Sequence, residues 1–516
     1  MIFRDWLKEL DYTLLQGSVD VETEDVIYDS RKAAPGKVFV AMKGIRVDGH
    51  SFIPQVLKAG VRVLVTERPV EEELKNSGLS EEELKQVTVV MVEEGRHALA
   101  LLSAARFDHP AKKLVMIGVT GTKGKTTTTH MIRAILLAAG KKVGMIGTTG
   151  TVIGDVVTPT LNTTPESYEL HQAFAQMVEA GCEYAVMEVS SQGIKMHRTD
   201  GLYFNYAIFT NISPDHIGPG EHADFEEYLY YKTRLLNMCG IGLVNKDDKH
   251  APQIIKAANC ELYTYSEESK EADFVASDIR YVSQPDFVGT EFHISGKYDM
   301  EVRLGIPGLF NVVNALAAVS VCSFLGLDQA RISHALENIR VNGRMEIVYT
   351  SERCTVLVDY AHNAVSMESL LSTLRDYKPK RLVCVFGCGG NRSKDRRYSM
   401  GLIGGDLGDV RRYSMGEIGG KMADLSIITA DNSRYEKVED IIADIRGSIE
   451  KTGGKFIEIP DRREAIRYSI LHAQPGDMVA VIGKGHEDYQ EINGVRHHFL
   501  DREVIEETVK ELGEKA

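Results

Sequence analysis

Short apolar runs and segments of helical periodicity alternate along most of this chain of 516 residues. Up to about residue 110 the apolar runs are 38–42 and 61–65, and an acidic segment of helical composition follows at 71–85. Turn-forming Pro-Gly and Asp-Gly pairs separate these segments. The pattern predicts a small N-terminal α/β domain over residues 1–110.

The alternation becomes regular beyond residue 110. Over residues 111–342 the apolar runs are 114–119, 143–146, 184–189, 206–211 and 241–245, and over residues 343–516 they are 355–359, 381–386, 425–429 and 478–482. Repeated β-α-β order favours parallel, doubly wound sheets. We therefore expect a three-domain α/β protein, with a central, largely parallel P-loop-type domain and a C-terminal Rossmann-like domain.

The run 114–119 leads into Thr-Gly-Thr-Lys-Gly-Lys-Thr at 120–126. Gly121 and Gly124 would let backbone N–H groups approach phosphate oxygens, Lys125 supplies a charge, and Thr126 offers a hydroxyl to magnesium. The first glycine of the general pattern falls on Val119, so the match is irregular. A nucleoside triphosphate site is predicted; a turn that needs glycine only for its geometry is the alternative.

Polar clusters follow six of the apolar runs, at 188–191, 211–216, 359–362, 387–392, 431–434 and 483–487. Ligands of open α/β sheets bind outside the carboxyl ends of the strands. The clusters and the phosphate loop together predict a cleft between two α/β domains.

The charge balance narrows the possible partners. Lys plus Arg 60 against Asp plus Glu 74 gives a net charge of -14, which argues against nucleic acid and anionic membranes as general partners. No apolar run approaches ~18 residues and the start lacks a signal-peptide core, so we expect a cytoplasmic protein without membrane insertion, most simply a monomer. The seven cysteines form no Cys-x-x-Cys pair, which favours reduced thiols.

A tandem repeat lies between two of the polar clusters. Residues 396–405 return as 411–420 with nine of ten positions identical, a period of 15 residues. Inside one helix this insertion would add ~22 Å and leave a rotation of ~60°. We predict that one copy is extruded as a loop, helped by the glycine pairs 404–405 and 419–420, each of which could end a helix.

At these motifs the chain resembles the Mur ligases, ATP-dependent enzymes that form amide bonds in peptidoglycan synthesis, and in particular their diamino-acid-adding type. The resemblance extends over essentially the whole chain and rests on the motifs at 29–31, 44–49, 120–126, 162–165, 188–191, 215–216, 311–314, 342–344, 359–362, 387–392, 431–434 and 483–487. The phosphate loop has the form Thr-Gly-Thr-x-Gly-Lys-Thr that this family uses.

The resemblance implies that a substrate carboxylate attacks the γ-phosphate of ATP and that an amine then attacks the acyl phosphate. Two anions meet in the first step, so Mg²⁺ and cations must neutralise charge. The implied catalytic residues are Lys125, Glu188, His216 and Lys232, and the implied metal ligands are Thr126, Glu188, His216 and Lys232 once it is carbamoylated. From the residues alone, Lys232 would be an ordinary lysine on a helix surface.

The implied ATP-binding residues are Gly121, Thr122, Lys123, Gly124, Lys125, Thr126, Thr127, Asn311, Asn314, Arg344, Asp359 and His362. Helix capping or packing is an open alternative for Asn311 and Asn314. The residues implied for the UDP-sugar-peptide are Tyr28, Ser30, Ile45, Arg46, Val47, Asn162, Thr163, Thr164, Ser190, Met196 and Arg198. Met196 replaces the usual glutamine of this type.

The added amino acid would be a diamino acid, held by Arg392, Asp431, Asn432, Ser433, Arg434, Gly483 and Glu487. Arg434 suits the distal carboxylate of meso-diaminopimelate, because a buried guanidinium without a partner is costly. Ser433 replaces the proline usual in this loop, which weakens the assignment. The acceptor is then UDP-N-acetylmuramoyl-L-alanyl-D-glutamate.

Three alternatives stay open. The added residue could be L-lysine or L-ornithine. The chain could be a catalytically silent nucleotide-binding paralogue, since it carries the repeat, Met196 and Ser433. A ligase acting on another acceptor, such as cyanophycin or folate, is disfavoured because it needs neither a uridine-diphosphate pocket nor an arginine that reads diaminopimelate.

Overall fold

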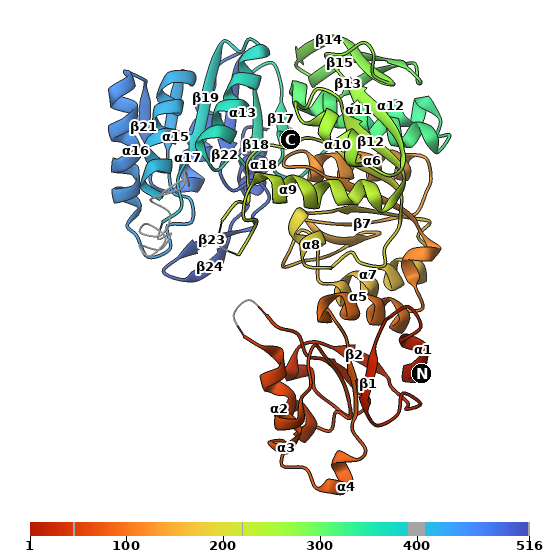
Figure 1. Ribbon diagram of the computed structural model, residues 1–516. Helices are drawn as coiled ribbons and strands as arrows, with labels where there is room; N and C mark the ends of the chain where they lie inside the picture. The colour runs from red at the N-terminus through yellow and green to blue at the C-terminus, as the bar shows by residue number, and fades with distance from the viewer. Residues whose placement is uncertain (45–46, 219, 391–407, 514–516) are drawn as a thin grey trace. The chain divides into compact units, whose positions relative to one another are not determined.

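The computed structural model describes residues 1–44, 47–218, 220–390 and 408–513 (Figure 1). The chain forms two compact units, the first made of Met1–Val275, Gly296–Tyr298 and Leu316–Ile332, and the second of Ala276–Ser295, Asp299–Ala315 and Ser333–Ala516. Among the described residues, none of the helices combines the length and the apolar character needed to cross a bilayer.

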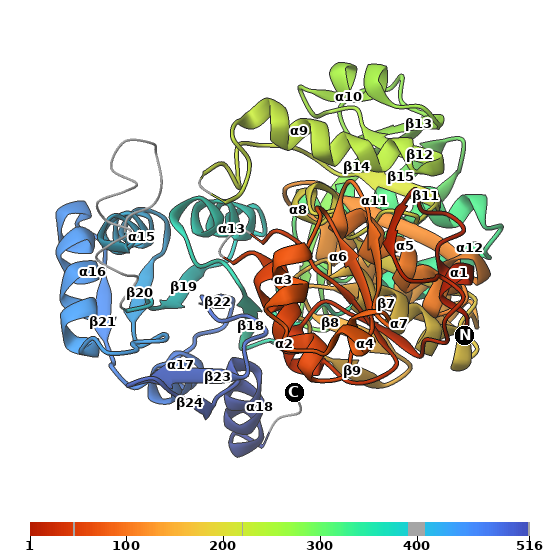
Figure 2. The same cartoon turned by 60° about the horizontal axis from the view of Figure 1, so that its bottom comes forward.

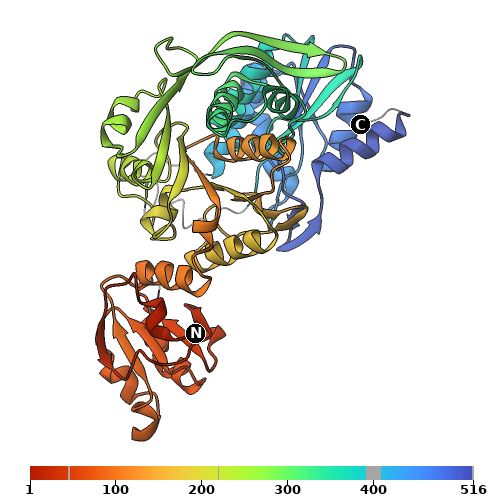
Figure 3. The ribbon, with the colours of Figure 1, turned by 90° about the vertical axis from the view of Figure 1, so that its right-hand side faces the viewer.

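A five-stranded sheet opens the first unit, in the order β1-β5-β4-β3-β2. Its strands are β1 (Thr13–Gln16), β2 (Asp25–Ile27), β3 (Lys37–Val40), β4 (Val63–Thr66) and β5 (Thr88–Met91), and only β1 is antiparallel to its neighbour. Helices α1 (Phe3–Trp6) and α5 (Gly95–Arg106) cover one face, and α2 (Ile53–Lys58) covers the other (Figure 3). Alternation along β3 explains this, since Val38 and Val40 pack with α5 while Phe39 packs with α2.

The acidic segment differs from the single helical stretch expected at 71–85. It forms two short helices, α3 (Glu71–Lys75) and α4 (Glu81–Leu84). Gly78 between them has a φ of 73°, a left-handed conformation that glycine adopts without strain.

Eight strands of the central sheet lie in the first unit, in the order β13-β12-β11-β6-β10-β7-β8-β9. They are β6 (Val115–Thr120), β7 (Val143–Gly147), β8 (Gly150–Ile153), β9 (Val156–Thr158), β10 (Tyr184–Glu188), β11 (Phe204–Phe209), β12 (Cys239–Asn245) and β13 (Glu261–Ser266). All neighbours from β13 to β7 are parallel, and β8 and β9 add an antiparallel hairpin edge. The helices of this part are α6 (Lys125–Ala138), α7 (Ser167–Glu179), α8 (Ser191–Lys195), α9 (Phe225–Thr233) and α10 (Ala251–Ala257).

Strand β14 (Phe274–Gln284) begins beside β13 and leads into the second unit. It is followed by the antiparallel pair β15 (Phe287–Gly296) and β16 (Met300–Leu304), and then by helices α11 (Leu309–Phe324) and α12 (Gln329–Glu337).

The second unit contains a six-stranded sheet in the order β17-β18-β22-β19-β20-β21. Its strands are β17 (Glu346–Thr350), β18 (Cys354–Asp359), β19 (Arg381–Phe386), β20 (Leu425–Ile428), β21 (Phe456–Glu458) and β22 (Asp477–Ile482), and only β17 is antiparallel. Helices α13 (Ala364–Asp376), α15 (Gly408–Met422) and α16 (Val438–Thr452) lie on one side, and α17 (Arg462–Leu471) and α18 (Asp501–Glu511) on the other (Figure 2). A hairpin of β23 (Tyr489–Ile492) and β24 (Val495–His498) precedes α18.

These sheets confirm the predicted α/β fold. The polar clusters follow the carboxyl ends of β10, β11, β18, β19, β20 and β22, as expected from the apolar runs. The described part of the repeat needs one correction.

The second copy of the repeat, 411–420, lies within α15, whereas the first copy and the glycines 404–405 lie outside the described residues. The prediction that Gly419 and Gly420 end a helix is wrong, because α15 continues to Met422. The glycines serve close packing instead: a Cβ on Gly416 would lie 2.6 Å from the Ile445 oxygen, and one on Gly420 would lie 2.1 Å from Thr452 Oγ1. Glycine therefore lets α15 approach α16.

Arg412 adds a polar contact to the same helix pair. Its guanidinium donates to Asp444 Oδ2 at 2.9 Å and also pairs with Glu436, while its side chain is largely buried. Removing this side chain would leave two carboxylates without their cation.

We expect Arg412→Met to lower the stability of the protein by about 2 kcal/mol, since hydrogen bonds to charged groups contribute about that much. Thermal unfolding would show the loss as a lower Tm. Lys421→Met, which removes an exposed ion pair with Glu417 on the same helix, is the matched control and should leave Tm in place. Equal losses in the two variants would contradict the stabilising role of the buried Arg412 contacts.

Candidate active site

The phosphate loop joins β6 to α6 in the first unit. Gly121 has a φ of 143°, and a Cβ there would lie 2.0 Å from Thr210 Oγ1, so a side chain does not fit. Gly124 has a φ of 87° and directly precedes α6. The first N–H groups of a helix have no acceptor within the helix and attract anions. The loop thus has the conformation of a phosphate cradle.

The end of β11 supports this loop from the neighbouring strand. Asn211 accepts from the N–H groups of Thr122 and Lys123, through its backbone oxygen and its Oδ1, at 2.9 Å each. Thr210 Oγ1 donates to the Lys123 oxygen at 2.6 Å. The N–H groups of Thr122 and Lys123 are therefore engaged within the protein, and the start of α6 offers the donors for an anion. Asn211 was within a predicted polar cluster but had no assigned role.

Glu188 ends β10 and its side chain is buried. Both carboxylate oxygens accept from Thr126 Oγ1 at 3.0 Å. Thr148 donates from its N–H at 2.9 Å and from its hydroxyl at 3.2 Å. A carboxylate beside hydroxyl oxygens is a donor set that suits Mg²⁺, a hard cation. Thr148 was not predicted, although it directly follows β7, which contains the apolar run 143–146.

Lys232 is buried on α9 rather than exposed on its surface. Its Nζ donates to the Gly121 oxygen at 2.8 Å and lies 4.7 Å from the centre of the Tyr228 ring. Burial, reinforced by the nearby charge of Lys125, holds the pKa of Lys232 well below its ordinary value. The alternative of an ordinary surface lysine is therefore wrong.

Two more predicted residues border this loop. Lys125 Nζ donates to the oxygens of Gly121 and Thr122 at 2.9 and 3.1 Å. His216 has a φ of 53° and an exposed ring, 6.1 Å from the Tyr228 ring. The Tyr228 hydroxyl lies 3.1 Å from Thr122 Oγ1, so Tyr228 stands between the loop and His216. Thr127 is buried in the first turn of α6.

Several residues predicted for the sugar-peptide contact the Glu188 strand. Thr164 Oγ1 donates to the Glu188 backbone oxygen at 3.0 Å and accepts from the Ser190 N–H at 2.9 Å. Thr163 Oγ1 lies 3.1 Å from Thr148 Oγ1. Arg198 pairs with Glu166 at 2.6 Å and donates to the Thr164 oxygen at 3.0 Å. Met196 directly follows α8, and Asn162 is exposed.

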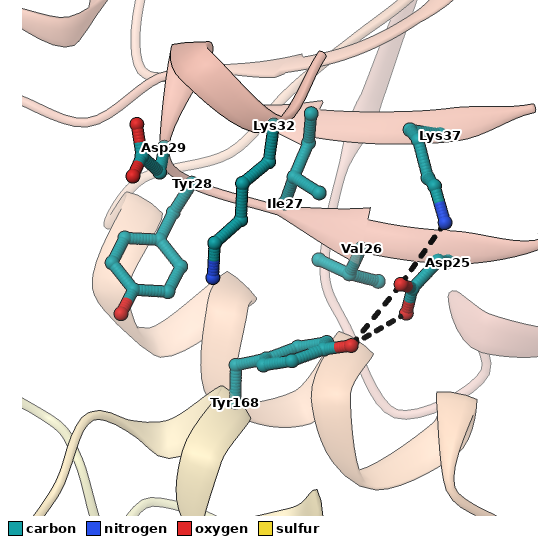
Figure 4. A pocket seen from close by; sticks show the side chains of 8 residues that line it. All are labelled: Asp25, Val26, Ile27, Tyr28, Asp29, Lys32, Lys37 and Tyr168. Atoms are coloured by element: carbon teal, nitrogen blue, oxygen red, sulfur yellow. Dashed lines mark hydrogen bonds and ion pairs between the residues drawn. The ribbon is translucent and has the colours of Figure 1, made fainter. Parts of the chain in front are cut away.

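A cavity of about 210 Å³ lies against β2 and the segment that follows it (Figure 4). Its lining residues are Asp25, Val26, Ile27, Tyr28, Asp29, Lys32, Lys37 and Tyr168. The Tyr28 hydroxyl donates to Glu169 at 2.9 Å, and burial, with Glu169 nearby, raises its pKa. Ser30 begins the short 3-10 segment Ser30–Lys32, Val47 is exposed, and Ile45 and Arg46 lie outside the described residues.

The nucleotide residues predicted in the second unit fall into two groups. Asn311 Nδ2 donates to the Pro307 oxygen at 2.7 Å and Asn314 Nδ2 to Asn311 Oδ1 at 3.3 Å, contacts that fit the packing alternative. Asp359 accepts from the N–H groups of Met345 and Ala361 at 2.8 Å, and burial raises its pKa against the opposing effect of Arg344.

The second group consists of Arg344, Asp359 and His362, and aromatic contacts connect two of these residues. The Arg344 guanidinium lies 5.0 Å from the Tyr360 ring centre, and the His362 and His486 rings lie 4.7 and 5.1 Å from the same ring.

Two loops of the second unit carry the residues predicted for the amino acid. Asn432 Nδ2 donates to Glu487 Oε2 at 2.9 Å, and the fully buried Lys484 donates from Nζ to Asn432 Oδ1 and Glu487 Oε2 at 3.2 Å each. Arg434 has a φ of 53°, donates from NH1 to the Gly390 oxygen at 2.8 Å, and keeps its side chain 30% exposed.

The other residues predicted to bind the amino acid differ in burial and in backbone conformation. Asp431 and Ser433 are buried, and Gly483 has a φ of 114° with the Asp431 carboxylate close to where a Cβ would lie. Arg392 lies outside the described residues. Lys484 was missed, although it lies inside the predicted cluster 483–487.

Comparison with known proteins agrees with this architecture. Residues 23–107 match the model "Mur ligase family, catalytic domain", 119–322 the "Mur ligase middle domain" and 343–485 the "Mur ligase, glutamate ligase domain". The chain is 38% identical, over 98% of both chains, to the UDP-N-acetylmuramoyl-L-alanyl-D-glutamate–2,6-diaminopimelate ligase of Caldanaerobacter subterraneus. It is 36% identical to the ligase of the same name from Clostridium perfringens, over 98% of this chain and 99% of that one.

Solved structures give the same result. A ligase of that name superposes with a TM-score of 0.70 at 29% identity, covering 96% of both chains. A folylpolyglutamate synthase from Thermotoga maritima shares the fold with a TM-score of 0.56 at 17% identity, over 75% of this chain and 92% of that one. With its three matching domains and its full-length relatives, the chain belongs to the Mur ligase family, a family of ligases.

Proposed function

We propose that this ligase uses ATP to join meso-2,6-diaminopimelate to UDP-N-acetylmuramoyl-L-alanyl-D-glutamate in peptidoglycan biosynthesis. The observation that carries the proposal is the 38% identity to a 2,6-diaminopimelate ligase over 98% of both chains. The three parts of the chain would share the work: residues 1–110 for the UDP end, 111–342 for ATP and 343–516 for the amino acid. We propose that the enzyme acts in the cytoplasm, as a monomer.

The phosphate loop, Lys125, Thr126 and Glu188 would hold the triphosphate and Mg²⁺. Bound ATP supplies the phosphoryl group that activates the substrate carboxylate, and Mg²⁺ neutralises charge there. The protein contributes a left-handed glycine at Gly121, the open donors at the start of α6, and a buried carboxylate fixed by Thr126 and Thr148. Donors and charges held in place before the reaction cost no reorganisation during it.

The amino acid would bind between the loops of Arg434 and Glu487. The Arg434 guanidinium keeps solvent-accessible area and can fork onto the distal carboxylate, whereas Glu487 offers an anion to the distal ammonium. L-lysine has no distal carboxylate and could not form this pair, so Arg434 would keep only its contacts with Glu491 and the Gly390 oxygen.

In an assay of phosphate release with one amine at a time, we expect wild-type enzyme to prefer meso-diaminopimelate over L-lysine and L-ornithine. Arg434→Met should lower kcat/KM for diaminopimelate by about 2 kcal/mol, roughly 30-fold, because a charge-assisted pair is lost. Arg446→Met on α16, which removes an exposed ion pair with Glu458 of β21, is the matched control.

A preference for lysine would replace the substrate assignment with the lysine-adding alternative. Nucleotide binding without phosphate release, in the presence of the acceptor and every amine, would favour the silent paralogue.

We also propose that Lys232 is carbamoylated. A lysine reacts with CO₂ as the neutral amine, and the buried position of Lys232 lowers its pKa and so favours that form. The carbamate would be an anion and could bind Mg²⁺ near the phosphate loop, where an ammonium would repel the metal.

Lys232→Met should lower activity by about 10- to 100-fold, the usual cost of losing a group that supports a metal site. Enzyme equilibrated with ¹³C-bicarbonate should give a carbamate NMR signal that Lys232→Met lacks. Lys141→Arg, on the surface in an ion pair with Glu183, should keep both the signal and the activity. A wild-type spectrum without a carbamate signal would rule the modification out.

A further inference from the structure

Arg462 and Asp501 form a fully buried ion pair between the first residues of α17 and α18. Arg462 Nε and NH2 donate to the two Asp501 carboxylate oxygens at 2.7 Å each, a bidentate geometry. Both side chains have no exposed area. Burying two charges costs free energy, and apolar residues often serve equally well for stability.

The guanidinium also donates to two backbone oxygens. Arg462 NH1 bonds the Ala430 oxygen at 3.3 Å, and NH2 bonds the Ile482 oxygen at 3.1 Å. Ala430 directly precedes the loop of Asp431 and Arg434, and Ile482 directly precedes the loop of Gly483 and Glu487. One side chain therefore holds the starting points of both loops predicted to bind the amino acid.

The sheet itself does not join these two points. In the strand order β22-β19-β20, strand β19 lies between the other two, so no ladder of hydrogen bonds connects β20 with β22. Arg462 reaches across the end of β19 to both strands. Farther along the same loops, Lys484 and Asn432 meet Glu487 and complete the connection.

We propose that Arg462 and Asp501 are positioning residues that set the spacing between the Arg434 loop and the Glu487 loop, and thereby select the length and the charges of the diamino acid. This inference rests on the proposed function of the two loops. A rigid spacing matters because the two ends of one substrate must meet both charged groups at once.

The test replaces the pair with apolar residues, Arg462→Met with Asp501→Leu, so that no buried charge is left alone. The control, Arg463→Met with Glu507→Leu, removes an exposed ion pair between the same two helices. For each protein, Tm and the KM values for diaminopimelate, ATP and the nucleotide-sugar would be measured, together with the ratio of kcat/KM for diaminopimelate to that for lysine.

We expect the buried double variant to raise KM for diaminopimelate about tenfold or more and to lower the ratio, with KM for ATP within about twofold. The control should match wild type. An unchanged KM for diaminopimelate, whatever happens to Tm, would overturn the inference alone. Wild-type enzyme that forms no ADP with any diamino acid would overturn the proposed function and the inference together.

If the double variant does not fold, Arg462→Lys decides the question by the same measurements. A lysine keeps the charge beside Asp501 but lacks the planar fork that reaches both backbone oxygens. The same selective rise in KM supports the positioning role, and wild-type values overturn it.

Discussion

The buried carboxylate of Glu188 is the interaction on which the rest of the first unit's site depends. Its oxygens join the start of α6, through Thr126, to the end of β7, through Thr148, and its backbone oxygen receives the Thr164 hydroxyl. The hydrogen bonds described for the carboxylate come from neutral donors. A buried anion held in this way favours a cation beside it, since a buried charge without a counter-charge is costly. The phosphate loop and the residues proposed for Mg²⁺ and for the sugar-peptide would thus share one fixed point.

The position of polar residues at the carboxyl ends of parallel strands explains which parts of the site could be predicted from the sequence. The apolar runs located the strands, and the polar residues after them located the phosphate loop, Glu188 and the loops of Arg434 and Glu487, because parallel strands bring their ends to one edge. The roles of Asn211, Thr148 and Lys484 depend on which strands are neighbours, and strand order is not encoded in any one segment. The burial of Lys232 could not be predicted either, because the sequence of one helical turn does not show whether that turn faces solvent or packs against a distant loop.

The helix of the second repeat copy shows a different limit. Paired glycines can end a helix, and nothing local distinguishes that use from close packing. The difference lies in α16, whose backbone and Thr452 occupy the space where side chains of α15 would stand. Gly419 is limited in the same way by Ser426 and Phe386, so residues distant in the sequence determine that these glycines serve packing.

The repeat also bears on how this gene can change. Two nearly identical copies in tandem invite recombination between them, and such an event would remove a whole number of codons and keep the reading frame. Loss of residues 406–420 would bring the first copy to the position of the second, with Leu402 where Glu417 now stands and residues 393–395 in place of 408–410. The arginine and glycine positions that pack on α16 recur in both copies. Glu417 pairs only with its own helix neighbour Lys421 among the contacts described for it, so the exchange would cost one exposed ion pair. A chain that had lost one copy would thus keep the residues that hold α15 against α16.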